Sequence, residues 1–141
     1  MNDKIDIVII GELWIGKSEF NRINKIREKQ NLELYKNPRN LAAGTIRQLD
    51  PKVVAERKLN YFAYDVEKVT GELPTKNQSE EIELLKKFGF NVNSESKFCK
   101  SLQDIQSIYE AWNGDNRDSE EYAIDGLVVK VNEREIYDNL G

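Results

Sequence analysis

The sequence predicts an α+β fold in which antiparallel β-sheets are flanked by helices. Its 141 residues are enough for one domain with a single sizeable core. Hydrophobic residues make up 39% and charged residues 33% of the chain, a composition typical of globular proteins. Runs rich in β-branched residues are mixed with amphipathic stretches in an order that gives no repeating βαβ series. We therefore expect antiparallel strands, in one domain over 1–141.

The first seventy residues contain signals for two strands and three helices. A run rich in β-branched residues predicts a buried strand over 6–15. Ser18 can cap a following helix over 19–30, in which apolar side chains recur every three positions. Pro38 disfavours helical backbone at the residue before it, so we expect the next helix only from about Ala42. The remaining predicted elements are a short helix over 50–58 and a strand over 60–69.

The second half predicts two well-delimited helices, a strand and a terminal helix. Ser79 precedes acidic residues and an apolar stripe that ends at Gly89, which predicts a helix between them. Ser101 predicts the cap of a second helix that reaches about Trp112. Both apolar stripes are more typical of core packing than of ligand binding. The remaining predicted elements are an apolar strand over 122–132 and a helix over 133–140.

The composition excludes several kinds of catalysis. The chain has no histidine, so catalytic triads and HExxH metal sites are excluded and its chemistry must use Lys, Arg, Asp and Glu. The single cysteine, Cys99, can form neither an internal disulfide nor a CxxC zinc site, which agrees with a reducing compartment. The longest apolar run, 7–10, is too short to span a bilayer, and MNDKID is no secretory signal. We expect a cytoplasmic protein.

Charge is distributed unevenly along the chain, although the net charge is only -4. Residues 22–58 carry 10 basic and 4 acidic side chains, whereas residues 59–141 carry 9 and 17. The basic segment contains Asn37, Arg39 and Arg47, in NPRNLAAGTIRQLDP. Arginine near the start of a small-residue helix suits phosphate, because guanidinium groups and free backbone amides both donate to oxygen. A solvated basic face is the alternative, and neither a Walker loop nor GxGxxG occurs.

Two apolar segments each carry a carboxylate that their pattern does not favour. Glu12 lies in IIGELWI and Asp125 in AIDGLVVKV. A charge in such a run is costly unless it is paired, hydrogen-bonded or facing a wet cleft, and an outward-facing residue on an edge strand is the alternative. Lys130 follows Asp125 by five positions, so a regular strand would place the two on opposite faces. A bulge at Gly126 would bring them to one face, and the functional interpretation depends on it.

Two further candidates carry weaker signals. Tyr64 lies in the strand predicted over 60–69, where a tyrosine usually packs in the core but can also stack on a base. Arg117 precedes the last predicted strand in a polar loop, where contact with solvent is the default. Neither position identifies a ligand by itself.

Three blocks of the sequence are distinctive when they are considered together: GELWIGKSEFNRIN, NPRNLAAGTIRQLDPKVVAERKLNYFAY and IDGLVVKVN. In this order, and close to these separations, they resemble three successive motifs of the adenylation (nucleotidyltransferase) domain of NAD-dependent DNA ligases. The resemblance covers about residues 7–141, and NPRNLAAGTIRQLDP is too long and peculiar to match by chance. It implies an incomplete nucleotidyltransferase core of the ATP-grasp-like kind.

The resemblance implies a nucleotide-binding role for four candidates. Glu12 resembles the motif carboxylate near the ribose, Tyr64 the tyrosine that stacks on adenine, and Lys130 the lysine that contacts bound adenylate. Arg117 resembles the arginine that precedes the fourth motif, on the cofactor side of the site. Glu12 and Lys130 are also implied to be catalytic, and Glu12 to be a metal ligand.

The remaining candidates are implied to serve phosphates and metal. Asn37, Arg39 and Arg47 resemble motif residues that contact nucleotide and DNA phosphates. Asp125 resembles the fourth motif's metal- or phosphate-side acid and is implied to be catalytic. We expect the acids, the amine and the guanidinium groups of this site to meet around a single adenylate.

The family reaction fits a chain without histidine. A lysine attacks the adenylyl phosphorus of NAD, nicotinamide mononucleotide leaves, and the enzyme carries lysyl-AMP. AMP then passes to the 5′ phosphate of a nick, and the 3′ hydroxyl displaces it to seal the strand. The resemblance thus implies NAD and Mg²⁺ as cofactors, and nicked double-stranded DNA as the partner, in DNA replication and repair.

The family's nucleophilic lysine lies in a KxDG motif, which does not occur in this sequence. Ile10 stands where the family often has arginine, and the final motif lysine is expected downstream of Gly141. We expect the isolated chain not to ligate DNA, as a fragment, a diverged remnant, or one chain of a split ligase whose partner chain or missing flanking domains bring the nucleophile. The alternative function is a non-catalytic nucleotide- or nucleic-acid-binding module.

Overall fold

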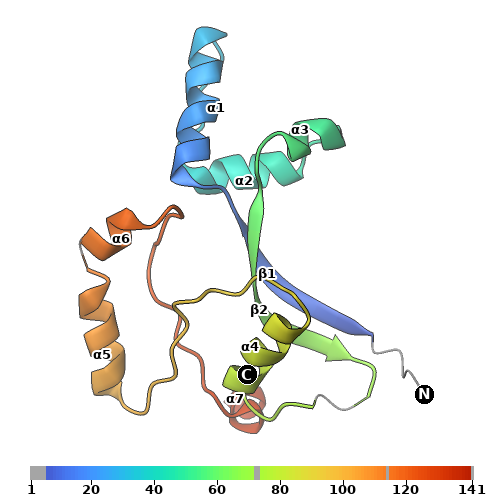
Figure 1. Cartoon of the computed structure of the whole chain (residues 1–141), viewed down its shortest axis with the longest axis vertical. Coiled ribbons are helices and arrows are strands. Elements are labelled where there is room, and N and C mark those ends of the chain that lie inside the picture. Colours follow the sequence, from blue (N-terminus) through green and yellow to red (C-terminus); the bar gives the residue numbers. More distant parts are fainter. Residues whose placement is uncertain (1–5, 72–73, 114, 141) are drawn as a thin grey trace. The chain divides into compact units, whose positions relative to one another are not determined.

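A computed structural model of the chain describes residues 6–71, 74–113 and 115–140, and its strands and helices are drawn in Figure 1. Strands and helices are mixed, as the α+β prediction requires. None of the helices in these ranges is long and apolar enough to cross a membrane. The elements in chain order are β1 (Ile7–Trp14), α1 (Lys17–Lys29), α2 (Pro38–Ile46), α3 (Pro51–Ala55), β2 (Asn60–Val69), α4 (Gln78–Lys87), α5 (Leu102–Ala111), α6 (Asp115–Ser119) and α7 (Arg134–Leu140).

Strands β1 and β2 pair in a two-stranded sheet, which confirms the strands predicted over 6–15 and 60–69 (Figure 1). The pairing is antiparallel, because Thr70 donates its backbone N–H to the Asp6 carbonyl oxygen at 2.9 Å while Gly11 lies opposite Phe62. A Cβ atom on Gly11 would lie 2.7 Å from the Phe62 carbonyl oxygen. The close approach of the two backbones at this point therefore requires glycine.

The chain divides into two compact units. The first unit comprises Met1–Glu12, Tyr61–Lys100 and Leu127–Gly141, and the second comprises Leu13–Asn60 and Ser101–Gly126. The single domain predicted over 1–141 thus contains two clusters of internal contacts. Each unit has a small apolar core of its own.

The core of the first unit forms where α4 lies against β2. Ala63 and Val66 of the strand and Leu85 of the helix are buried together. The predicted helix between Ser79 and Gly89 is confirmed, but it begins at Gln78 after Asn77, whose side chain makes no capping bond. The Ser79 N–H instead donates to the Asn132 side chain at 3.1 Å, so a distant segment satisfies this end of the helix.

The core of the second unit joins α1 and α2. Its buried side chains are Ile15, Ile23, Leu41 and Ala42. Helix α2 begins at Pro38, earlier than predicted, because Asn37 adopts extended backbone and its side chain accepts the Asn40 N–H at 2.8 Å. The proline that we expected to delay the helix occupies its first turn instead.

Helix α1 also begins differently from the prediction. Its N-cap is Gly16, and Ser18 does not cap it. The backbone N–H and hydroxyl of Ser18 donate to the Glu121 carboxylate, and the Lys17 N–H donates to the Glu121 carbonyl oxygen at 2.7 Å. A residue about a hundred positions away in the sequence therefore satisfies the first turn, which local patterns do not reveal. The prediction for Ser101 is confirmed, with a full capping box that includes Asp104.

The strand predicted over 122–132 is wrong. No residue of this segment pairs in a sheet, and Val128 has 86% of its surface exposed. An apolar alternating run becomes a strand only when another strand takes its backbone hydrogen bonds, and the described residues provide none for it. The bulge expected at Gly126 consequently has no ladder in which to form.

Candidate functional site

The predicted site residues are divided between the two units. The first unit contains Glu12, Tyr64 and Lys130. The second unit contains Asn37, Arg39, Arg47, Arg117 and Asp125. The meeting of all these groups around one adenylate therefore stays a prediction.

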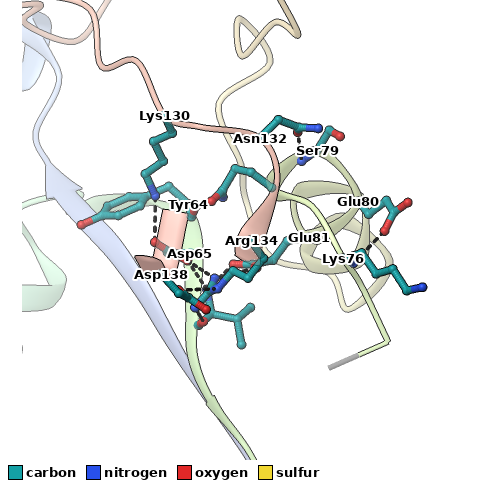
Figure 2. Close-up of polar contacts among 12 residues, drawn as sticks. Tyr64, Asp65, Lys76, Ser79, Glu80, Glu81, Lys130, Asn132, Arg134 and Asp138 are labelled. Atoms are coloured by element: carbon teal, nitrogen blue, oxygen red, sulfur yellow. Dashed lines mark hydrogen bonds and ion pairs between the residues drawn. The ribbon is translucent and has the colours of Figure 1, made fainter. Parts of the chain in front are cut away.

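Tyr64 and Lys130 lie side by side in the first unit, as Figure 2 shows. The Lys130 Nζ atom is 4.9 Å from the centroid of the Tyr64 ring, within the range of a cation–π contact. Tyr64 is partly exposed, and its carbonyl oxygen accepts a 2.8 Å hydrogen bond from Gln78 Nε2 of α4. The structure thus brings together two residues that are 66 positions apart and were both predicted to contact the nucleotide.

The Lys130 ammonium is held by a carboxylate that sequence analysis did not select. It donates to Asp65 Oδ2 at 2.8 Å. Arg134 Nη1 lies 3.1 Å from Asp65 Oδ1 and 3.0 Å from Glu81 Oε2, and Arg134 Nη2 donates to the Val66 carbonyl oxygen (Figure 2). Strand β2, helix α4, helix α7 and the segment carrying Lys130 are therefore joined by one network of charged groups.

The two carboxyl groups of this network titrate in opposite directions. Burial and a hydrogen bond with Asp65 raise the pKa of Glu81 to about 7. Burial would also raise the pKa of Asp65, but hydrogen bonds from Lys130 and Glu81, with the charges of Lys130 and Arg134, keep it below its usual value. Asp65 is therefore the ionised partner of Lys130 near neutral pH, while Glu81 exchanges a proton there.

The network could have been anticipated in part from the sequence. Asp65 interrupts the apolar run of β2 in the same way that Glu12 interrupts β1, so the pattern that indicates Glu12 also indicates Asp65. Glu81 lies four positions before Leu85, on the face of α4 that is buried. Arg134 has no comparable signal, because Asp65 and Glu81 are more than fifty positions away from it in the sequence.

Glu12 lies near the end of β1 with an exposed side chain. Among the residues that the structure describes, no group of three or more His, Cys, Asp or Glu side chains could hold a metal ion. The metal role predicted for Glu12 and Asp125 therefore depends on ligands supplied from elsewhere, such as substrate phosphates.

The second unit contains a looser ion pair at the start of α2. Arg39 Nη1 lies 3.6 Å from Asp125 Oδ2, and the two side chains are 76% and 83% exposed. Such an exposed pair contributes little to stability, so a phosphate can compete for the guanidinium. The Asn37 side chain already caps α2 by accepting the Asn40 N–H, so a phosphate at this helix end would meet the backbone of Asn37 rather than its side chain.

Arg47 and Arg117 are fixed locally within the second unit. Arg47 forms the C-cap of α2 and donates from Nε to the Ala43 carbonyl oxygen at 3.1 Å. It lies eight residues after Arg39, or about 12 Å along a helix axis, so the two arginines suit different phosphates. Arg117 lies in α6, not in a loop, and donates from Nε to the Ile124 carbonyl oxygen at 2.7 Å, one residue before Asp125.

Comparison with known proteins defines the class of the chain. Residues 1–141 match the family model described as NAD-dependent DNA ligase adenylation domain. A DNA ligase of Clostridioides difficile (strain 630) is 42% identical over 141 residues, which cover all of this chain and 21% of the relative. DNA ligases of Acetivibrio thermocellus and Mycoplasma capricolum are 42% and 38% identical over 93% and 100% of the chain, and over 20% and 21% of their own lengths.

The relatives are named DNA ligases, and the family model specifies one domain, the adenylation domain, of the NAD-dependent kind. The chain belongs to the NAD-dependent DNA ligase adenylation domain family. The resemblance noted from its three sequence blocks is thereby confirmed. The chain spans about a fifth of the length of the relatives that it matches.

Proposed function

We propose that this chain is the adenylate- and phosphate-binding segment of an NAD-dependent DNA ligase, used in lysyl-AMP formation and nick sealing. Membership of the adenylation family supports the reaction, with NAD as the nucleotide donor and nicked duplex DNA as the partner. The observation that carries the proposal is the Lys130 ammonium 4.9 Å from the ring of the half-exposed Tyr64. An aromatic ring beside a cation suits a purine base that carries a phosphate.

The residues of the first unit would bind the nucleoside and its phosphate. The Tyr64 ring would stack on adenine, and Lys130 would donate to a phosphate oxygen. Negative charge develops on the phosphate oxygens when the adenylyl group is transferred, and the ammonium would stabilise it. Glu12 would accept from the ribose hydroxyls, because an ionised carboxylate is an acceptor only. Each of these roles is one of binding and orientation, and the nucleophile is a separate lysine.

The basic residues of the second unit would serve phosphates of the nucleotide and of DNA. Arg39 is the best placed, since it lies in the first turn of the nine-residue α2 and its exposed ion pair with Asp125 is easily displaced. Asn37 would contribute the backbone of that helix end, and Arg47 a second phosphate contact. Arg117 would order the segment that leads to Asp125.

A magnesium ion fits the chemistry of the candidate acids. Asp125 is largely exposed and lies 3.6 Å from Arg39, and Mg²⁺ is commonly held by one or two carboxylates together with substrate phosphates. Asp125, in the second unit, and Glu12, in the first, are each proposed as a metal ligand. When bound, the ion neutralises charge on the phosphate oxygens during transfer.

The nucleophile is proposed to lie outside the 141 residues, since they contain no KxDG. The isolated chain would then bind nucleotide without sealing nicks, and a partner chain or flanking segment in the cytoplasm would complete it. The alternative, a non-catalytic binding module, also predicts nucleotide binding. The two differ once a KxDG-containing segment is supplied, because only the ligase segment then supports lysyl-AMP formation.

Isothermal titration of the chain with AMP tests the proposal. We expect saturable binding at submillimolar AMP, with a loss of at least tenfold in affinity, about 1.4 kcal/mol, for Tyr64→Ala and for Lys130→Ala. Lys97→Ala is the matched control, because Lys97 is an exposed lysine of the same unit and its ion pair is with Glu95, two positions away in the sequence. Absence of binding at millimolar AMP, or equal losses for all three variants, would overturn the proposed function.

A further inference from the structure

A network of charged side chains adjoins Tyr64, and the proposed function leaves most of it without a role. Its members are Asp65, Glu81, Lys130, Arg134 and Asp138 (Figure 2). We propose that Asp65 and Arg134 are positioning residues, which hold the Lys130 ammonium against the Tyr64 ring before a nucleotide binds. This inference rests on the proposed function of Lys130 and Tyr64 in binding adenylate.

Lys130 needs such a constraint because its own backbone provides little. It lies in a segment that forms no sheet, and a lysine side chain has many rotamers to lose. The backbone is anchored further along the chain, at Asn132, whose carbonyl oxygen accepts the Gln78 N–H at 2.7 Å, and at Arg134, whose N–H donates to the Lys76 carbonyl oxygen at 3.1 Å. The ammonium, at the other end of a four-carbon chain, is fixed by Asp65.

The Asp65 carboxylate is itself held in one orientation. Its Oδ1 atom accepts from the Val66 N–H at 2.9 Å and from Arg134 at 3.1 Å, which leaves Oδ2 directed to Lys130. Arg134 is itself fixed, because it also bonds Glu81 and the Val66 carbonyl oxygen and lies 3.5 Å from Asp138. A carboxylate with one oxygen fixed and one presented is suited to hold a mobile cation.

The charge state of the network agrees with this role. Five ionisable groups face one another: two cations, Lys130 and Arg134, and three carboxyl groups, Asp65, Glu81 and Asp138. The pKa of Asp65 is lowered, whereas that of Glu81 is raised to about 7. The group in contact with Lys130 therefore stays ionised through the neutral range, and the proton is taken up by the carboxyl group that does not touch Lys130.

An ammonium has three N–H donors, and the contact with Asp65 uses one of them. The remaining two would be offered to a phosphate next to a base stacked on Tyr64. Holding the cation in advance removes the ordering cost from the binding step. Loss of Asp65 should therefore weaken nucleotide binding even though Asp65 touches no nucleotide.

NMR of the chain with ¹³C-labelled lysine tests the positioning directly. Protons held over an aromatic face are shifted upfield, so the Lys130 Hε resonances should lie outside the cluster formed by the exposed lysines, and K130R identifies them by their disappearance. We expect D65N to return them to that cluster and to weaken AMP binding by roughly tenfold. E81Q, which replaces a carboxyl group that does not touch Lys130, should leave the resonances in place at neutral pH.

The outcomes separate the inference from the proposed function. Unchanged Lys130 resonances in D65N overturn the positioning role, whatever the nucleotide affinity. If D65N fails to fold, D65E keeps the charge, displaces the ammonium by one methylene and must still move the resonances. If the wild-type resonances lie upfield but AMP does not bind, the proposed function fails, and the contact of Asp65 with Lys130 is only a structural ion pair.

Discussion

Two cations predicted for the same binding site are held in opposite ways. Lys130 meets Asp65 at 2.8 Å with side chains that are 22% and 12% exposed, whereas Arg39 meets Asp125 at 3.6 Å with both side chains largely exposed. The first pair belongs to a network that reaches two helices and a strand, and the second stands at the surface. The proposed roles match this difference, since a partly buried ion pair holds its cation more firmly than an exposed one.

The largest expected effect comes from removing the centre of the buried network. Arg134→Met leaves two buried carboxyl groups without their shared guanidinium, and we expect it to lower the free energy of unfolding by about 3–5 kcal/mol. Urea denaturation followed by circular dichroism measures this. Arg39→Met is the matched control and should cost less than about 1 kcal/mol. Equal losses for the two variants would mean that the two ion pairs do not differ as described.

The pH dependence of stability should reveal Glu81. Because the folded chain binds this proton with a pKa of about 7, above the ordinary value of 4.5, the free energy of unfolding should fall as pH rises from about 4.5 through 7. The full change is up to about 3 kcal/mol. Glu81→Gln should flatten the profile, while Glu83→Gln, on the same helix but exposed, should not. A wild-type profile that rises over this range would contradict the raised pKa.

The closely paired strands at Gly11 and the open segment at Gly126 should also differ in their tolerance of an added methyl group. Gly11→Ala would force a Cβ to 2.7 Å from a backbone oxygen of β2 and should cost about 1–3 kcal/mol. Gly126→Ala, next to Asp125, meets nothing within 4 Å and should be neutral or slightly stabilising. Thermal unfolding of the two variants compares them. A neutral Gly11→Ala would show that the strands can separate at this point.

The smallest expected effect on stability belongs to the exposed pair, which should matter for DNA instead. Arg39→Ala should change the free energy of unfolding by less than about 1 kcal/mol. It should reduce the magnitude of the slope of log affinity for nicked duplex DNA against log salt concentration by about 1, which corresponds to the loss of one phosphate contact. Fluorescence anisotropy across a salt series measures the slope, with Lys97→Ala as the control outside the basic segment. An unchanged slope would remove Arg39 from the proposed interface.

Local signals in the sequence predicted elements better than the contacts between them. Strands β1 and β2 and helix α5 with its Ser101 cap follow from periodicity and capping residues within one element. The starts of α1 and α4 were misplaced because Glu121 and Asn132 satisfy them from far along the chain. The segment 122–132 was mistaken for a strand for the same reason, since pairing depends on a partner that its own residues cannot specify.

The candidate site shows the same division. Tyr64 and Lys130 were chosen by motif resemblance, and the structure brings them together. Asp65, Glu81 and Arg134 were missed, because a buried ion-pair network links residues by their position in the fold and not by spacing. The one available signal, a carboxylate within an apolar strand, identifies a charge that needs a partner without naming it.

Contact between Tyr64 and adenine is the central claim, and intermolecular nuclear Overhauser effects measure it most directly. In the chain saturated with AMP, we predict effects between the Tyr64 ring protons and adenine H2 or H8, lost in Tyr64→Ala. Saturation with AMP without any such effect would contradict the account, because the base would then lie away from the ring beside which Lys130 is held.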